Sequence, residues 1–318
     1  MKTRFLNKNN KTLIDKNNPL QIAITSIFEN RIPVFLPVKQ TTHLKLKKEL
    51  DEKGFVVFET SYGLLEIRGT LLTQTHKNLL EAILSYEKYL VEDDSYYVKF
   101  KPYDLLKNRL GKKHPNDYSH LNKLLKELAS FSMVLKVTKD IEIGFRFIDD
   151  FLIDNRVSGN RKENFYFVKF TRVLSAIWKN ETLYNYSKIL PVFDKITIPI
   201  VQAITKFLLT YDKYEIKVEK LLDIFNLRKI FSTEKSRQKI LSDVRKSFSN
   251  PEILFFYKHF GIYYIEKEDK IGINKSEILL TEDLLLEIKR EKSFTSKMEE
   301  KHKIEQQKAF KAEQLSLF

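Results

Sequence analysis

The stretch that decides the fold is residues 116–148, which read NDYSHLNKLLKELASFSMVLKVTKDIEIGFRFI. Its first half carries leucines at helical spacing and predicts a helix that begins at Asn116 or Asp117. Its second half alternates like two strands, Met133–Thr138 and Ile141–Ile148, with a short turn between them. The stretch therefore predicts a helix that leads directly into a two-stranded hairpin.

The residues before this stretch complete a recognisable order of elements. Thr73 is expected to cap a helix that runs to about Tyr89. Tyr96–Phe100 alternates like a strand, and Pro102 suits the first turn of a second helix. Helix, strand, helix, helix and two-stranded wing is the order of a winged helix-turn-helix unit.

The same order is predicted again in the C-terminal half. Ser130-Phe131-Ser132 recurs as Ser247-Phe248-Ser249, each time where the third helix leads into the wing. Two unrelated amphipathic stretches are the alternative. The expected elements are a helix with Thr197 as cap and Pro199 in its first turn, a strand over Tyr214–Val218, a helix over Leu221–Phe225, a helix capped by Ser232 or Thr233 that ends near Phe248, and wing strands over Ile253–Lys258, Ile262–Lys267 and Lys270–Asn274.

The remaining segments are assigned more coarsely. Gly54–Phe58 and Gly63–Arg68 predict a hairpin, residues 154–163 a mobile loop, and residues 171–179 a helix. The chain is predicted to have an α+β fold made of two tandem winged helix-turn-helix domains and a charged, largely helical or flexible C-terminal arm. The predicted divisions are 1–60 as an N-terminal extension, 61–190 as the first winged-helix domain with a connector, 191–278 as the second winged-helix, DNA-binding domain, and 279–318 as the arm.

Composition favours a polyanionic partner. Lys and Arg number 56 against 42 Asp and Glu, which leaves a net charge of +14. Nucleic acid is the first expectation for such a balance, and an AT-rich genome that encodes lysine freely is the alternative. The chain has no Cys, no apolar signal core at its start and no segment of membrane-spanning length. We expect a soluble cytoplasmic protein without a membrane partner.

The third helix of each unit is the predicted DNA-reading element, because a helix fits the major groove. In the second unit we expect Arg237 to contact a base, since its guanidinium can pair with guanine. The neighbouring cations are expected at phosphates. A solvated face of an amphipathic helix is the alternative. The DNA-binding residues predicted here are Arg228, Lys229, Lys235, Ser236, Arg237, Lys239, Arg245 and Lys246.

The third helix of the first unit is less basic. We expect it to contribute phosphate contacts or to serve dimer contacts instead. Its candidate DNA-binding residues are Lys112, Lys113, Tyr118, His120 and Lys123.

No catalytic, metal or cofactor site is expected. The six histidines form neither a His-x-His nor a His-Glu-x-x-His pair, and no Gly-x-x-x-x-Gly-Lys loop is present to hold ATP phosphates. Asp149-Asp150 and Asp154 form an acidic cluster that we interpret as a helix cap or a solvated turn in a loop. The sequence therefore argues against an enzyme.

The chain ends in Gln314-Leu315-Ser316-Leu317-Phe318, a short peptide whose apolar side chains suit a preformed pocket on another protein. Every position matches the motif by which bacterial proteins dock on the sliding clamp of the replicase. An apolar tail folded back on the body is the alternative. The preceding charged segment would carry this peptide away from the body.

Two winged-helix units, a basic balance and a clamp motif together resemble the iteron-binding plasmid replication initiators. Residues 71–83, LLTQTHKNLLEAI, look like the opening helix of the first winged helix in that family. The resemblance covers about residues 65–275. A clamp motif known within the family lies upstream, towards the first winged helix, whereas here it is C-terminal.

The resemblance implies binding to repeated sites in double-stranded origin DNA, with the second unit reading each site and the first assisting. It also implies opening of an adjacent AT-rich region and recruitment of the sliding clamp, the replicative helicase and the host initiator. In this family a homodimer represses its own gene while monomers initiate. The alternatives are a twin winged-helix transcriptional repressor without a replication role, and a clamp-tethered repair accessory protein or nuclease.

Overall fold

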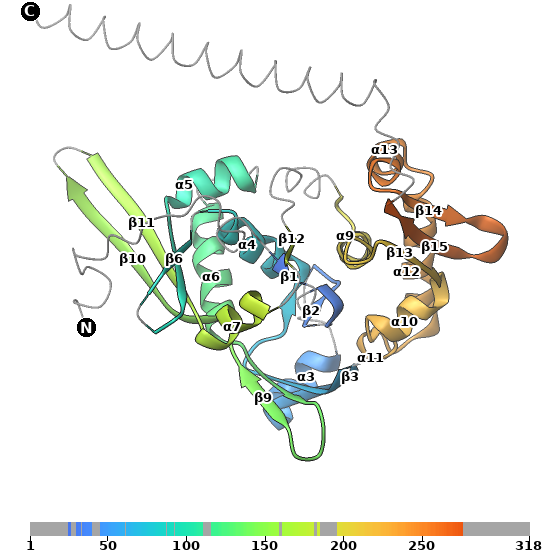
Figure 1. Cartoon of the computed structure of the whole chain (residues 1–318), viewed down its shortest axis with the longest axis horizontal. Coiled ribbons are helices and arrows are strands. Elements are labelled where there is room, and N and C mark those ends of the chain that lie inside the picture. The colour runs from blue at the N-terminus through green and yellow to red at the C-terminus, as the bar shows by residue number, and fades with distance from the viewer. Residues whose placement is uncertain are drawn as a thin grey trace, which may run out of the picture.

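The computed structural model describes residues 25–26, 30–32, 34–39, 45–60, 62–86, 88–91, 93–110, 116–158, 161–180, 183–184 and 196–275. We call the described residues up to 184 the first unit and residues 196–275 the second unit. The two units lie side by side, the first coloured blue to yellow-green and the second yellow to red in Figure 1. Both mix helices with antiparallel strands, so the predicted α+β class is confirmed.

The elements of the first unit are β1 (Thr25–Ser26), β2 (Phe35–Leu36), α3 (Lys45–Lys53), β3 (Phe55–Thr60), β4 (Gly63–Arg68), β5 (Leu72–Thr73), α4 (Gln74–Leu84), β6 (Lys88–Leu90), β7 (Tyr96–Phe100), α5 (Pro102–Asp104), the π-helix η1 (Leu105–Arg109), α6 (Asn116–Ser130), β8 (Ser132–Lys136), β9 (Glu142–Phe145), β10 (Ile148–Ser158), β11 (Arg161–Phe170), α7 (Arg172–Asn180) and β12 (Leu183–Tyr184). Those of the second unit are α9 (Pro199–Leu208), β13 (Lys213–Lys217), the 3-10 helix η3 (Val218–Lys220), α10 (Leu221–Ile224), α11 (Leu227–Ile230), α12 (Glu234–Ser247), α13 (Pro251–His259), β14 (Ile262–Ile265), the 3-10 helix η4 (Glu266–Glu268) and β15 (Lys270–Asn274).

One sheet of the first unit has the strand order β3-β4-β8-β9 and contains both hairpins that the sequence predicts. Alternate residues of β3 and β4, such as Val56 and Leu65, are fully buried because one face of the sheet packs on the core. Gly63 opens β4 with φ of +127°, and a Cβ there would lie 2.1 Å from the carbonyl oxygen of Lys136. Glycine is therefore required where the β3–β4 turn meets β8.

The N-terminal residues contribute to this core. β2 pairs in parallel with β5, and Ile32, Val34 and Leu36 are buried. Strand β3 belongs to the same sheet as β4 and β8, although it falls within the stretch that the sequence assigns to an N-terminal extension. Apolar side chains between two prolines give little periodicity, which is why their burial was not evident from the sequence.

The second sheet of the first unit, β10-β11-β7-β6, corrects two predictions. Residues 154–158 and 161–163 are strand rather than loop, because β10 runs to Ser158 and β11 begins at Arg161 in antiparallel register. A backbone ladder forms irrespective of side-chain polarity, so a polar stretch is compatible with a two-stranded ribbon. The acidic residues 149, 150 and 154 accordingly lie on a strand rather than in a loop.

The two units share an order of elements but differ in strand pairing. In the second unit the strand after the first helix, β13, pairs with the wing strand β15, as in a winged helix. In the first unit the corresponding strand β7 pairs with β11 and β6, and the wing strand β8 pairs instead with β4. Sequence order predicts the elements, whereas the pairing depends on which strand edges meet in space.

Two local predictions for the second unit are wrong. Residues 253–258 form part of helix α13, since Asn250 and Pro251 provide a helix start and an apolar run alone does not distinguish a strand from a buried helix. The cap of α9 is Ile198 rather than Thr197, with Pro199 at the first helical position. In the first unit, α4 begins after Thr73 as predicted but ends at Leu84, and α6 begins at Asn116 as predicted.

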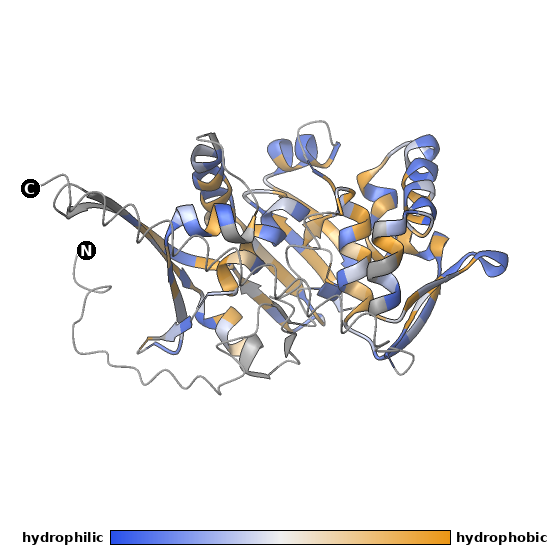
Figure 2. Cartoon of the chain, turned by 90° about the horizontal axis from the view of Figure 1, so that it is seen from above, coloured by the Kyte–Doolittle hydropathy of each residue, from blue (hydrophilic) through white to orange (hydrophobic). Residues whose placement is uncertain are grey.

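The units contact each other along α4 and α9 (Figure 1). Lys206 of α9 donates a hydrogen bond to Glu81 of α4, and both side chains are about 98% buried or more, with exposed fractions of 1% and 2%. Lys206 also donates to Asn78 at 2.9 Å, and Asn78 donates to Gln202 at 3.1 Å. Hydrophobic segments run through the interior of both units (Figure 2).

Candidate nucleic-acid interface

Helix α12 is positioned by a well-defined start and an apolar face. Thr233 caps the helix, and its Oγ1 accepts from the Ser236 backbone N–H at 3.3 Å. Leu241 and Val244 are buried, so this side of the helix packs on the second unit. The predicted cap at Ser232 or Thr233 is therefore confirmed at Thr233, and the opposite side of α12 is left exposed.

Three lysines share that exposed side of α12. Lys235, Lys239 and Lys246 are separated by four and seven residues, which places them on one face of a helix. All three are exposed, and none makes a hydrogen bond or ion pair with the described part of the chain. We call them the lysine stripe. The stripe places three exposed ammonium groups along one line, where they can contact phosphates.

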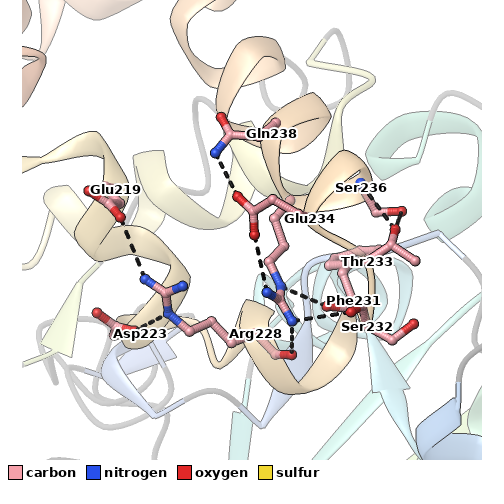
Figure 3. A network of polar contacts seen from close by, with 10 residues as sticks. Glu219, Asp223, Arg228, Phe231, Ser232, Thr233, Glu234, Ser236 and Gln238 are labelled. Atoms are coloured by element: carbon pink, nitrogen blue, oxygen red, sulfur yellow. Dashed lines mark hydrogen bonds and ion pairs between the residues drawn. The ribbon is translucent and has the colours of Figure 1, made fainter.

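Arg237, the predicted base contact, has a different environment (Figure 3). Its Nε donates to the carbonyl of Phe231 at 2.9 Å, and Nη2 donates to the carbonyls of Arg228 and Ser232, both at 3.3 Å. Nη1 pairs with Glu234 at 3.2 Å, and the side chain is 21% exposed. In this conformation Arg237 joins the turn before α12 to the helix and does not present a free guanidinium to a base.

Glu234 is held from two sides in the same network. Gln238 donates to its carboxylate at 2.8 Å, and this hydrogen bond, followed by that of Arg237, lowers the pKa of Glu234. Arg228 lies beside this group but bonds to Asp223 at 2.8 Å and lies 3.7 Å from Glu219 (Figure 3). Carboxylates of the protein thus engage Arg228 and Arg237, two of the three arginines that the sequence placed at the DNA.

Arg245 connects α12 to the wing. Its Nε and Nη2 donate to the two carboxylate oxygens of Asp269 at 2.8 and 2.7 Å, and Tyr264 donates to the same carboxylate at 2.9 Å. The bidentate contact lowers the pKa of Asp269 and raises that of Arg245. Asp269 has φ of +49°, in the left-handed region that Asp tolerates better than most residues. Arg245 therefore fixes the wing turn.

Lys229 contacts the first unit. Its Nζ donates to the carbonyl of Val57 on β3 and lies 5.4 Å from the ring centre of Phe58. Asn226, at the start of α11, donates to the carbonyl of Glu59 at 2.9 Å. β3 is an edge strand, so these side chains satisfy carbonyls that would otherwise lack a partner strand. Lys229 is engaged between the units rather than directed at a ligand.

In the first unit, α6 exposes part of the predicted set. His120 and Lys123 lie on its exposed side, and Lys123 is 3.9 Å from Glu127. Tyr118 is partly buried on the side that faces the sheet, where Tyr166 donates to Asn122 at 2.7 Å. Lys112 and Lys113 lie outside the described residues, as do Gln314 to Phe318.

The sequence missed the residues that hold the candidate reading helix in place. Asp269, Asn226 and Glu234 act by contacts with segments that are distant in the sequence or that lie across a turn. Glu234 directly after the predicted cap Thr233, and Asp269 directly before a predicted strand, are the local signals for two of them.

Within the described ranges, no three His, Asp or Glu side chains come together as a metal-binding group. In that same part of the chain, no helix combines the length and the apolar character needed to cross a bilayer.

Comparison with known proteins identifies a similar arrangement in solved structures. No protein-family model matches the chain, and no curated protein matches it. A crystal structure of selenomethionine derivatives of domains 2 and 3 of RctB covers 79% of this chain and 98% of that chain, at 12% identity and a TM-score of 0.47. A second structure, of RctB domains 2-3, covers 80% and 99%, at 12% identity and a TM-score of 0.46.

Proposed function

We propose that this chain is a cytoplasmic plasmid replication initiator that binds repeated sites in double-stranded origin DNA, without an enzyme activity or a cofactor of its own. The observation that carries the DNA-binding part is the lysine stripe. It lies along the exposed side of α12, while the nearby arginines are bound within the protein. A row of unpaired ammonium groups on a helix matches the spacing and charge of a DNA backbone.

The proposed contact is mainly electrostatic. Lys235, Lys239 and Lys246 would neutralise phosphates and release counterions, so affinity should fall steeply with salt. Ser236 and Gln238 lie on the first turns of α12, the part of a reading helix that faces base edges. Arg245 and Asp269 would hold the wing against the neighbouring backbone by fixing its turn to α12.

The test of DNA binding is a salt titration of origin-DNA affinity measured by fluorescence anisotropy. Replacing all three stripe lysines by Ala should reduce the slope of log K against log salt by about three, or about one per lysine. The matched control replaces Lys47, Lys48 and Lys53 of α3, each already paired with a carboxylate of its own helix. Equal slopes for wild type and stripe variant would contradict the proposal.

Replication is favoured over repression by the terminal motif Gln314 to Phe318, a sequence observation. Deleting these five residues should abolish binding to purified sliding clamp and leave DNA affinity unchanged. The alternative function is a twin winged-helix repressor, which has no use for the clamp. Unchanged clamp binding after the deletion, or no direct repeats of about two helical turns beside an AT-rich tract near the gene, would favour the repressor.

A further inference from the structure

A pocket of about 630 Å³ lies where the two units meet. Arg31 of the N-terminal segment, the β3–β4 turn of the first unit, and α9, β13 and α10 of the second unit form its walls. Its volume is in the range of small-molecule sites, and it contains none of the residues of the lysine stripe. It is therefore a separate candidate site, independent of the proposed DNA contact.

One wall is a stack of planar groups. The rings of Tyr211 and Tyr214 are stacked with centres 4.2 Å apart, and the guanidinium of Arg31 lies 3.9 Å from the centre of the Tyr211 ring. Arg31 is fixed by donating to the side chain and the carbonyl of Thr210, both at 3.0 Å. A planar guanidinium at the end of such a stack attracts a further aromatic ring and repels a cation.

Tyr62 supplies a second aromatic surface from the β3–β4 turn. Its side chain is 37% exposed, and its ring packs on no other aromatic ring of the described residues. Thr60 anchors Tyr62 to the start of β4, since its hydroxyl donates to the carbonyl of Gly63 at 2.8 Å and accepts from the Tyr62 N–H at 3.1 Å. Tyr62 is thus held at the pocket with a ring available for stacking.

The polar lining selects among planar ligands. Asp223 is bound to Arg228, whereas Glu59 makes no side-chain hydrogen bond or ion pair with the described residues. A free carboxylate accepts two parallel N–H groups. The Watson–Crick edge of guanine offers two adjacent N–H donors, while that of adenine offers one donor beside an acceptor that a carboxylate repels.

We propose that this pocket binds a guanine base, stacked against Arg31 and Tyr62 and hydrogen-bonded through its N1–H and N2–H groups to Glu59. The same chemistry is available from a free nucleotide and from an unpaired base of a single strand. Because the walls come from both units, an occupied pocket would also stabilise their relative arrangement.

The experiment measures binding of GMP, IMP and AMP to the full chain by isothermal titration calorimetry. GMP should bind about tenfold more tightly than AMP, and IMP, which lacks the N2 amine, should lie between them. A single-stranded trinucleotide with guanine between thymines is the second arm. If GMP binds, a free guanine nucleotide is sufficient as the ligand. If only the trinucleotide binds, the ligand is an unpaired guanine within a single strand. Binding of neither, or equal affinity for GMP and AMP, overturns the proposal.

Glu59 and Tyr62 are exposed, so substitutions at these two positions can test the location of the site without unfolding the protein. Glu59→Gln should remove the preference for GMP over AMP, and Tyr62→Leu should weaken both nucleotides about tenfold. The controls are Glu142→Gln on β9 and Tyr103→Leu, which is 55% exposed and outside the pocket. If GMP affinity is the same in Glu59→Gln, Tyr62→Leu and the controls, the pocket is not the site. Loss of DNA affinity in the lysine-stripe variant would not affect this result.

Discussion

At Arg237, a side chain with five N–H donors lies within reach of three backbone carbonyls and a carboxylate. These contacts form within the protein itself, so the guanidinium of Arg237 is already hydrogen-bonded in the folded state without a ligand. Lys239, two residues later, has no such partners in the described part of the chain because it lies on the other side of the same helix. The identity of a cationic residue therefore indicates less about its role than its position on the helix.

We expect Arg237→Ala to lower the free energy of unfolding by about 1–3 kcal/mol, because the carbonyls of the turn before α12 lose a charged donor. Urea denaturation checks this, with Lys239→Ala as the control that should change stability by less than about 0.5 kcal/mol. The reverse pattern, with unchanged stability in Arg237→Ala and loss of preference at one base position, would restore Arg237 as a base contact.

His76 gives the chain a pH-dependent stability. Its Nδ1 accepts from the Thr73 N–H at 3.0 Å, and its Nε2 lies 2.9 Å from Glu127, so the neutral ring completes a capping box for α4. Burial lowers the pKa of His76 below its ordinary 6.5, and neighbouring His120 and Lys123 act in the same direction, while Glu127 opposes them. Protonation of Nδ1 would turn this acceptor into a donor, so the hydrogen bond from the Thr73 N–H would be lost.

The unfolded chain therefore takes up the proton more readily than the folded one, and stability should fall as pH drops below about 6.5. His76→Gln keeps a capping-box residue and removes the titration, so its stability should change less between pH 7 and pH 5. His120→Gln, on the exposed side of α6, is the control and should keep the dependence. Thermal denaturation across this pH range is the measurement, and identical profiles for wild type and His76→Gln would contradict it.

At the scale of elements, α12 and the wing are joined by one carboxylate. Asp269 accepts Arg245 and Tyr264, and its carbonyl accepts from the Val218 N–H at 2.8 Å, so three segments converge on the turn between η4 and β15. The predicted third helix and wing are both present, but their relative position depends on this contact. The contact cannot be predicted from the periodicity of the sequence.

Asp269→Asn should loosen the wing without altering its backbone, since Asn also tolerates the left-handed conformation found there. We expect faster hydrogen exchange of the β14 and β15 amides, with α9 unaffected. The lowered pKa of Asp269 means that its stabilisation is present above about pH 4 and is lost as pH falls through the folded value. Asp243→Asn on α12 is the control. Unchanged exchange in β14 and β15 would show that packing alone holds the wing.

At the scale of the whole molecule, the two units are joined through polar contacts of differing burial. The Lys206–Glu81 pair between α9 and α4 is the most buried of them. Arg31 with Thr210 and Lys229 with Val57 add contacts at the pocket and at the β3 edge. Buried ion pairs tolerate few alternative geometries, so we expect these contacts to fix the orientation of α12 relative to the first unit.

A double-mutant cycle with Glu81→Leu, Lys206→Met and the two combined tests this junction. Glu81→Leu alone leaves a buried ammonium without its counter-charge and should cost about 3–5 kcal/mol, whereas Glu81→Leu combined with Lys206→Met should be close to neutral. The exposed Lys47–Asp51 pair of α3 is the control and should couple by less than about 0.5 kcal/mol. Additive effects at Glu81 and Lys206, measured by denaturant unfolding, would mean that the pair does not connect the units.

The sequence by itself determined the α+β class, the position of most helices and strands, both hairpins of the first sheet and the cap at Thr233. These depend on spacing and on turn residues that act within a few positions of one another. Only the tertiary structure decided that β7 pairs away from the wing and that residues 253–258 are helical. It also decided that Arg237 and Arg245 are internal contacts, while Lys235, Lys239 and Lys246 have no polar partner among the described residues. The physical reason is that hydrogen-bond partners and burial are set by segments that approach from elsewhere in the chain. A pattern of residue types predicts which side of a helix is buried, but it does not predict which residues of other segments contact that helix.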